Sequence, residues 1–199
     1  GGEGGWGAGN WGGRWGRGGP GRARKVAGRA VGIGGMGRIG RAIAHGVGAM
    51  GMRVAYTGRK PQDGPYRYVA DLASLASQVD FLVVACPGGA ATHHLVDARV
   101  LAALGAKGTL INIARGSIVD ESALARALVD GTIKGAGLDV FADEPRIPDA
   151  LLALDNVVLL PHVGSATQET RQAMGDLCKA NLDAWFTQRK TLTPIPELA

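Results

Sequence analysis

The stretch Val31-Gly-Ile-Gly-Gly-Met-Gly-Arg-Ile-Gly40 decides the fold of this chain, because it runs from an apolar strand into a glycine turn that opens a helix. Two overlapping GxGxxG spacings begin at Gly32 and at Gly35, and we favour the second. In that register Gly35 makes the tight turn, Gly37 lets the backbone approach a phosphate, and Gly40 permits close packing of helix on strand. The stretch therefore predicts a pyrophosphate site of a dinucleotide at a helix N-terminus.

The rest of the sequence alternates short apolar runs with helical periods. Phe81–Ala85 is entirely apolar and Thr109–Asn112 has an apolar centre, which is typical of strands buried on both faces of a parallel sheet. This alternation predicts an α/β fold of Rossmann type, a doubly wound parallel sheet with helices on both faces. The expected strands cover residues 29–34, 53–57, 80–85, 108–112, 135–140 and 157–160, and the expected helices cover 38–50, 71–78, 97–104, 120–130 and 167–187.

Length and composition suit one dinucleotide-binding domain with appendages. The chain has 199 residues, of which 46% are hydrophobic. We expect a glycine-rich flexible segment at 1–23, the dinucleotide-binding domain at 24–166, and a C-terminal helix and tail at 167–199. We expect no membrane span and no signal peptide, because the sequence shows neither an apolar run of sufficient length nor a charged start followed by an apolar core. Its two cysteines make no disulfide framework, so we expect a cytoplasmic protein without membrane contact.

The net charge of +5 is concentrated at the N-terminus. Residues 1–25 hold five cationic residues against Glu3, which gives +4 and leaves the remaining chain at +1. A basic surface for nucleic acid is therefore not expected of the folded part. The glycine-rich composition of the N-terminal segment favours a disordered arm, and its interspersed arginine and tryptophan leave RNA binding by that segment as the minor alternative.

The end of the second expected strand indicates which dinucleotide binds. NAD-binding domains place an acidic residue about 20 residues beyond the glycines, where it accepts a hydrogen bond from the adenosine ribose. Here that region holds Thr57, Gly58, Arg59 and Lys60, and the nearest downstream acid is Asp63. Two cations and a hydroxyl can hold a 2′-phosphate, and no carboxylate repels it. The sequence therefore favours NADP(H) over NAD, although NAD stays an alternative.

Several motifs accompany the glycine turn in a fixed order. With them, residues 24–195 or so resemble the D-2-hydroxyacid dehydrogenase family, and most closely its glyoxylate/hydroxypyruvate reductase branch. The resemblance implies an oxidoreductase that transfers hydride from NADPH to a small 2-oxoacid, hydroxypyruvate or glyoxylate, to give the D-2-hydroxy acid. The motifs are Val31–Ala44, Tyr56–Arg59, Val84–Gly89, Asn112–Asp120, Gly137–Phe141 with Asp143–Pro145, and Leu160–Thr167.

The resemblance implies a catalytic trio. Arg115 would bind the substrate carboxylate through its planar guanidinium group and polarise the neighbouring carbonyl. His162 would protonate the carbonyl oxygen as hydride arrives. Glu144 would pair with His162, orient the ring and favour its protonated form. Each of these residues taken alone has a duller interpretation as a surface or loop residue, and the family order is what supports the assignment.

The same motifs imply further contacts with the cofactor, all in loops that follow strands. Asp139 would hydrogen-bond the nicotinamide carboxamide, and His162 would lie beside the nicotinamide ring. The remaining histidines, His45, His93 and His94, are expected to be non-catalytic, and their spacing argues for no metal site. The other implied cofactor residues are Arg38, Ile39, Cys86, Pro87, Thr92, Ile113, Ala114, Arg115, Gly164 and Ser165.

The family builds its substrate domain mostly from sequence that precedes the glycine turn. In this sequence the glycine-rich segment stands there, so we interpret the chain as the nucleotide-binding domain with its N-terminal substrate lobe missing. A dinucleotide-binding module without turnover is therefore the alternative function. The resemblance also implies a homodimer. The final helix has apolar positions that we expect to be partly uncovered, at Met174, Leu177, Leu182 and Trp185.

Overall fold

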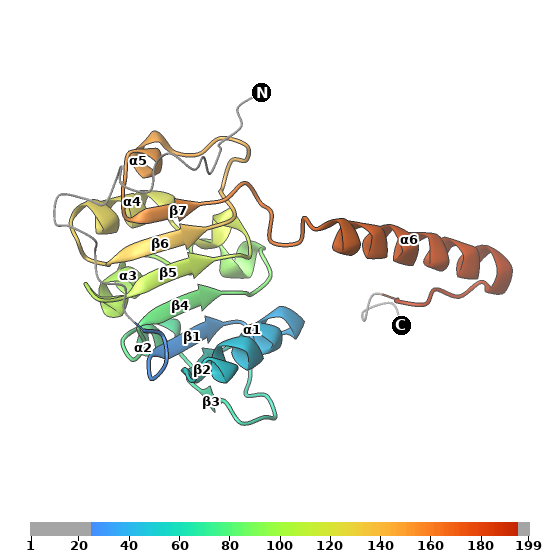
Figure 1. The fold of residues 1–199 in the computed structure, drawn as a ribbon, viewed down its shortest axis with the longest axis horizontal. Coiled ribbons are helices and arrows are strands. Elements are labelled where there is room, and N and C mark those ends of the chain that lie inside the picture. The colour runs from blue at the N-terminus through green and yellow to red at the C-terminus, as the bar shows by residue number, and fades with distance from the viewer. Residues whose placement is uncertain (1–24, 195–199) are drawn as a thin grey trace.

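The computed structural model describes residues 25–194, so the predicted segment 1–23 lies outside the described residues. The described part is built on one seven-stranded sheet, in which every strand pairs in parallel with its neighbours (Figure 1). The strand order is β3-β2-β1-β4-β5-β6-β7, and the direction of winding reverses between β1 and β4. The strands are β1 (Ala30–Gly34), β2 (Arg53–Thr57), β3 (Arg67–Tyr68), β4 (Phe81–Val84), β5 (Thr109–Asn112), β6 (Gly135–Leu138) and β7 (Val157–Leu159).

Helices cover both faces of the sheet, as the sequence predicts, but unequally. One face packs against α2, α3, α4 and α5, whereas α1 covers the other face over β1, β2 and β4. Alternate residues of β2, β4 and β5 therefore enter two separate cores. The helices are α1 (Arg38–Ala49), α2 (Leu72–Ala76), α3 (Ala98–Leu104), α4 (Glu121–Val129), α5 (Asp149–Leu152) and α6 (Gln168–Gln188), with 3₁₀ turns η1 (Ala90–Thr92) and η2 (Gly116–Ile118).

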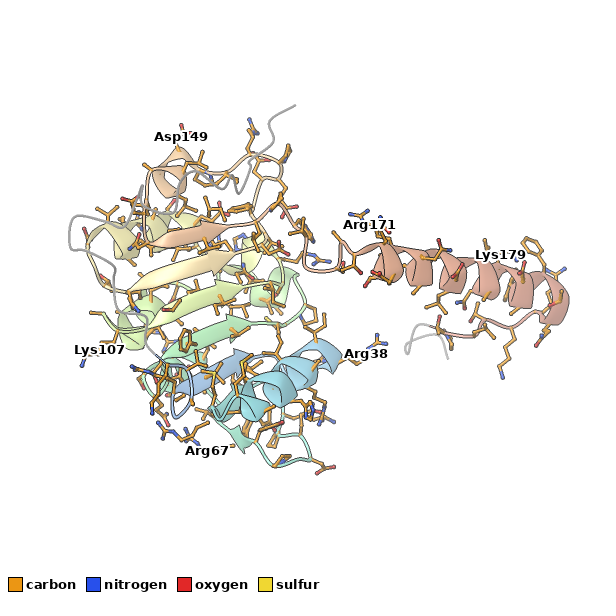
Figure 2. All side chains as sticks on the ribbon, viewed as in Figure 1. Arg38, Arg67, Lys107, Asp149, Arg171 and Lys179 are labelled. Atoms are coloured by element: carbon orange, nitrogen blue, oxygen red, sulfur yellow. The ribbon has the colours of Figure 1, made fainter. Side chains whose placement is uncertain are left out.

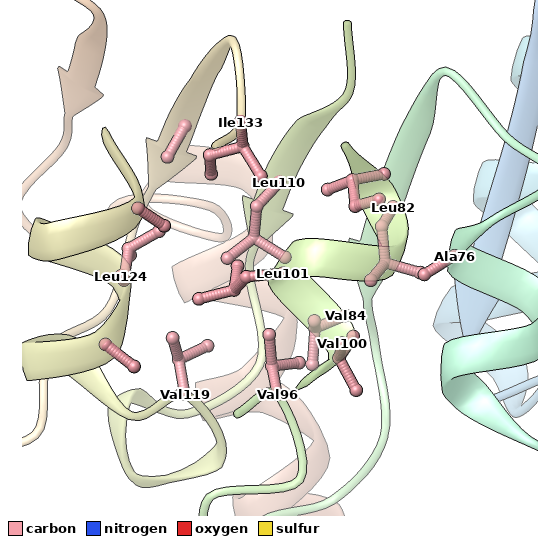
Figure 3. Packing of buried hydrophobic residues seen from close by; sticks show 14 of the residues in the cluster. Ala76, Leu82, Val84, Val96, Val100, Leu101, Leu110, Val119, Leu124 and Ile133 are labelled. Carbon is pink, nitrogen blue, oxygen red and sulfur yellow. The ribbon is translucent and has the colours of Figure 1, made fainter. Parts of the chain in front are cut away.

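The larger core lies between the sheet and the helices α2, α3 and α4 (Figure 3). Leu82 of β4 and Leu110 of β5 point into it and are fully buried, as are Leu101 of α3 and Leu124 of α4. Each such aliphatic side chain stabilises the fold by about 1.5–3 kcal/mol relative to an exposed one. This packing fixes the sheet rigidly, and with it the loops that leave the ends of its strands.

The helices start at residues that cap them. The side chains of Asp71, Asp97 and Asp120 each accept a hydrogen bond from a backbone N–H in the first turn of α2, α3 and α4, and Thr167 does the same for α6. Such caps satisfy donors that the helix leaves free. The predicted helices and strands are confirmed, most of them to within a residue or two. The sequence analysis missed β3 and α5, which have two and four residues.

The last helix lies apart from the sheet. Residues 163–167 lead out of the domain, and α6 projects away from it (Figure 1). Ala184 is the one residue of α6 that is buried. Met174, Leu177, Leu182 and Trp185 are 45–59% exposed, as the sequence analysis expects. No helix within residues 25–194 combines the length and the apolar character that crossing a membrane requires.

Candidate active site

A cleft opens at the carboxyl edge of the sheet, beside the ends of the paired strands β1 and β4, where the winding of the chain reverses. Its volume is about 550 Å³, and it lies between the first turn of α1, the loop after β4 and the loop after β5. Open α/β sheets bind ligands at such a reversal of strand order. Six of the predicted cofactor residues line this cleft: Ile39, Cys86, Pro87, Ile113, Ala114 and Arg115.

The glycine turn forms one wall and has the geometry that a pyrophosphate needs. Gly35 adopts a φ of +108°, and a Cβ there would lie 2.7 Å from the backbone of Cys86. A Cβ at Gly40 would overlap the carbonyl oxygen of Gly35, whereas one at Gly37 would meet no described atom within 4 Å. No side chain caps the N-terminus of α1, and its first turn has no acid. Its N–H groups and dipole are therefore free to bind an anion, which fits a dinucleotide.

Arg38 begins α1 and lies at the end of the helix beside the strands' carboxyl ends, opposite Lys107 at the amino edge (Figure 2). Arg59 and Lys60 are exposed in the loop after β2, next to Gly58. Thr57 differs from the expectation, because it is buried and its hydroxyl donates to the carbonyl of Ala70 at 3.3 Å. The hydroxyl proton of Thr57 is therefore already used within the protein.

Glu144 and His162 form the pair that the resemblance implies. Nδ1 of His162 lies 2.9 Å from Oε2 of Glu144, and Oε1 of Glu144 accepts a hydrogen bond from the N–H of Phe141 at 2.9 Å. The bond with His162 is the main cause that holds the pKa of Glu144 below its usual range, with the Phe141 N–H next and the charge of Arg115 a smaller contribution. Because Nδ1 faces the carboxylate, Nε2 is the ring atom left to exchange a proton with a substrate.

Arg115 lies on a turn that the end of β5 holds in place. The amide of Asn112 donates to the carbonyl of Arg115 at 3.0 Å, and its oxygen accepts from the N–H of Ala114 at 3.1 Å. Nη1 of Arg115 donates to the carbonyl of Ala114 at 2.6 Å. A Cβ at Gly116 would overlap the backbone of Phe141 and Ala142, so this glycine lets the turn approach the loop that carries Glu144.

Asp139 holds the turn on which His162 sits. It is 5% exposed, and its two carboxylate oxygens accept hydrogen bonds from the N–H groups of Val163 and Gly164, both at 2.8 Å. His162 itself has a φ of +55°, a left-handed conformation that a side chain rarely adopts. The carboxylate thus compensates local backbone strain at His162. Asp139 therefore has a positioning role besides the predicted contact with nicotinamide.

The other predicted residues follow the same edge of the sheet. Thr92 lies in η1, where its hydroxyl donates to the carbonyl of Pro87 at 2.8 Å. Gly164 and Ser165 follow β7, beside His162. His93 and His94 stack on each other with ring centroids 3.9 Å apart, and His45 is exposed on α1. Within residues 25–194, no group of three or more His, Cys, Asp or Glu side chains is arranged to hold a metal ion.

The sequence did not predict the residues that hydrogen-bond the loops around the site and hold them in place. Asn112 is 1% exposed, and a polar residue at the end of an apolar strand was the available signal. Glu121 accepts a hydrogen bond from the N–H of Ala142 at 2.8 Å and so connects α4 to the loop that carries Glu144. Arg41 and Tyr68 bind the loop after β2. Nothing in the local sequence distinguishes these three from ordinary surface or core residues.

Comparison with known proteins agrees with this geometry. Residues 7–164 match the family described as D-isomer specific 2-hydroxyacid dehydrogenase, NAD binding domain. The chain belongs to this family. This 2-hydroxyacid dehydrogenase domain is 52% identical over 173 residues to a glyoxylate/hydroxypyruvate reductase A of Arabidopsis thaliana, and 50% identical over 172 residues to a hydroxyphenylpyruvate reductase of Plectranthus scutellarioides. Both alignments cover 86% of this chain and 55% of the relative.

Solved structures give the same result. The 2-hydroxyacid dehydrogenase domain superposes with a TM-score of 0.83 on an NADPH-dependent glyoxylate/hydroxypyruvate reductase from Sinorhizobium meliloti, solved with NADP and malonate. The two are 54% identical, and the alignment covers 85% of this chain and 54% of the other. The chain thus spans about half the length of the curated relatives it matches.

Proposed function

We propose that this chain binds NADPH along the carboxyl edge of its sheet and serves the reduction of a small 2-oxoacid, hydroxypyruvate or glyoxylate, to the D-2-hydroxy acid. The observation that carries the proposal is the Glu144–His162 pair, which lies close enough to Arg115 for the charge of that residue to lower the pKa of Glu144, and Arg115 lines the cleft. The relatives named above as glyoxylate/hydroxypyruvate reductases support the substrate class.

The proposed roles follow from the chemistry of each group. When bound, the reduced nicotinamide supplies hydride to the 2-oxo carbon. The guanidinium group of Arg115 binds the substrate carboxylate through two parallel hydrogen bonds and so orients the carbonyl. Nε2 of His162 delivers a proton to the carbonyl oxygen, and Glu144 stabilises the charged ring before that transfer. In the reverse direction the same nitrogen accepts the proton of the hydroxyl.

Selectivity for NADPH over NADH is part of the proposal. Arg59 and Lys60 are exposed beside the end of β2, and neither is in an ion pair with a residue that the structure describes. Both charges are therefore available to a 2′-phosphate. The reductase from Sinorhizobium meliloti, described as NADPH-dependent, supports this choice.

The second candidate function is a dinucleotide-binding module without turnover. The side chains of Glu144 and His162 are 37% and 49% exposed, so the described residues leave the catalytic pair in contact with solvent. Reduction is faster when the site excludes water and fixes the substrate, and poor orientation alone can cost several kcal/mol of barrier. Binding without turnover is the outcome that would favour this candidate.

One experiment separates the two candidates. NADPH binding is measured by fluorescence, and NADPH oxidation is followed with hydroxypyruvate and with glyoxylate, with NADH in parallel. Turnover that is lost in His162→Ala but kept in His45→Ala supports the reductase, provided that both variants bind NADPH. Binding without turnover in the wild type supports the module, and a folded chain that binds neither cofactor contradicts both.

The cellular setting and assembly are also proposals. Cys86 and Cys178 are both free thiols, which supports a reducing compartment such as the cytoplasm. The apolar side chains exposed on α6 support association into a homodimer. Association with a substrate lobe, toward which residues 167–199 would return, is the alternative. Sedimentation velocity of the purified chain over a range of concentrations tests the homodimer.

A further inference from the structure

The loop between β2 and β3, residues 58–66, carries Arg59 and Lys60. These are the residues proposed above to bind a 2′-phosphate, so the inference below rests on that function. Long, flexible side chains bind an anion selectively only when the backbone beneath them is fixed, because otherwise binding must order both. Residues 58–66 belong to neither strand, so contacts other than strand pairing must fix this loop.

Two tyrosines from the neighbouring strands hold the loop at two points. The hydroxyl of Tyr68 donates to the carbonyl of Gly58 at 3.1 Å, immediately before Arg59. The hydroxyl of Tyr56, a residue 2% exposed, accepts from the N–H of Gln62 at 2.6 Å and donates to its carbonyl at 3.1 Å. The two rings pack with their centroids 5.5 Å apart, so the two anchors form one unit.

A third anchor comes from α1. Nη1 of Arg41 donates to the carbonyl of Asp63 at 3.1 Å, and Nη2 donates to Oε1 of Gln62 at 2.8 Å. Since α1 begins at the glycine turn, one helix carries the predicted pyrophosphate site at its N-terminus and grips the loop one turn later. The guanidinium group of Arg41 is thus committed to the loop, and its planar fork is what allows two donors to act together.

We propose that Tyr68 and Arg41 are positioning residues for cofactor selectivity: they hold the 58–66 loop so that Arg59 and Lys60 face the 2′-phosphate. Neither side chain is a ligand of the phosphate in this arrangement. Tyr68 fixes the start of the loop at Gly58, and Arg41 fixes its middle at Gln62 and Asp63. The backbone that carries Arg59 and Lys60 is therefore held at both ends. Loss of either anchor weakens binding of the 2′-phosphate and leaves binding of the rest of the nucleotide unchanged.

Tyr68→Phe tests the first anchor, because it removes the hydroxyl and keeps the ring that packs on Tyr56. The probes are adenosine 2′,5′-bisphosphate and adenosine 5′-monophosphate, titrated into the whole chain by calorimetry. We expect affinity for the bisphosphate to fall by about 5-fold, the worth of one hydrogen bond, and affinity for the monophosphate to stay within about 2-fold. Tyr66→Phe is the matched control, a tyrosine of the same loop whose hydroxyl has no hydrogen bond to a described residue.

Arg41→Lys tests the second anchor, because it separates the hydrogen bonds of Arg41 to the loop from its positive charge. Lysine keeps the positive charge but cannot donate to both loop acceptors from a planar fork. We expect Arg41→Lys to lose bisphosphate affinity as Arg41→Ala does. If Arg41 instead acts on the phosphate through its charge, Arg41→Lys retains the affinity and the proposal for Arg41 is wrong.

The outcomes distinguish this inference from the function on which it rests. A wild-type chain that binds the two probes equally well contradicts the proposed NADPH preference itself. A wild type that prefers the bisphosphate, with a preference unchanged in Tyr68→Phe and Arg41→Lys, overturns the positioning role alone. Thermal unfolding and amide hydrogen exchange of residues 58–66 accompany each titration, so that faster exchange in the loop is seen in a chain that is otherwise folded.

Discussion

Single carboxylates do much of the positioning in this domain, and they do it by accepting hydrogen bonds from backbone N–H groups. Asp139 binds the turn of His162, Glu144 binds Phe141, and Asp80 binds Ala30 at the opposite edge of the sheet. Charge-assisted hydrogen bonds of this kind are stronger than neutral ones. Removal of one partner also leaves the other buried without a hydrogen bond, which destabilises the fold. The loops of the site are therefore fixed by a few acids.

The first prediction concerns Asp139. Replacement by Asn leaves one acceptor oxygen and turns an NH₂ group toward an N–H donor, so one buried hydrogen bond is lost and the strained turn at His162 is released. We expect the free energy of unfolding to fall by about 1–3 kcal/mol. Urea denaturation measures it, with Asp143→Asn as an exposed control expected to change it by less than about 1 kcal/mol. An equal effect of both substitutions would contradict the role of Asp139.

The second prediction concerns Asp80 and pH. The N–H of Ala30, followed by the hydrogen bond and charge of Arg29, holds the pKa of Asp80 below its ordinary value. A carboxylate with a lowered pKa in the folded state stabilises the protein above its unfolded pKa, and this contribution is lost as pH falls through the folded one. Asp80→Asn should therefore destabilise the chain at pH 7. In thermal melts, the difference from wild type should shrink below about pH 4 and not at higher pH.

At the scale of elements, the sequence predicts the helices and strands that are long enough to show a hydrophobic period. The apolar runs of β4 and β5 and the capped helices α3 and α4 follow from pattern alone. β3 consists of Arg67 and Tyr68, too few residues for an alternation, and forms because Ala55 and Tyr56 of β2 offer it an edge. The pairing of Glu144 with His162 followed from family resemblance, since nothing local connects two residues that lie 18 positions apart.

The supporting contacts were not predictable for a related reason. Asn112, Glu121 and Tyr68 act through backbone atoms of segments that are distant or irregular, and no sequence period relates a side chain to such a partner. The nicotinamide contact of Asp139 stays a prediction from the resemblance, whereas the hydrogen bonds that its two oxygens accept from Val163 and Gly164 were not predicted. The fold places these partners together, so their roles emerge only once the strands are in register.

The third prediction concerns β1. Gly34 lies inside this strand, where glycine weakens a strand, and a Cβ there would lie 3.6 Å from Leu72 in ordinary contact. Gly34→Ala should raise the free energy of unfolding by about 0.4–1 kcal/mol. Gly35→Ala, one residue on, is the control. Its positive φ and its closeness to Cys86 predict a loss of about 1–3 kcal/mol, so a gain at Gly35 or a loss at Gly34 in urea denaturation would refute the reasoning.

At the scale of the molecule, stability is distributed unevenly. Residues 30–160 share two cores around one sheet, whereas α6 contributes Ala184 as its one buried residue. Its helical form depends on local bonds such as the Thr167 cap and the pair of Lys179 with Asp183, each a small contribution. The boundary proposed between 166 and 167 coincides with this change.

The fourth prediction follows from that contrast. Amides of α6 in the isolated chain should exchange hydrogen on the order of 100-fold faster than those of β1, β4 and β5, because opening the helix exposes almost no buried surface. Hydrogen exchange followed by mass spectrometry gives the rates peptide by peptide. Equal protection of α6 and the central strands would mean that the helix is covered, as it would be in a stable dimer.

The glycine turn has a consequence for how such a domain changes over generations. Gly35 and Gly40 are required by the packing of the protein itself, whereas the space beside Gly37 is open. Selection for a folded, abundant protein therefore retains the first and third glycines and is indifferent to the second. A lineage that abandoned its nucleotide would drift at position 37 first, while Gly35 and Gly40 persisted, so a side chain at that one position would mark a descendant that keeps the architecture and has given up the ligand.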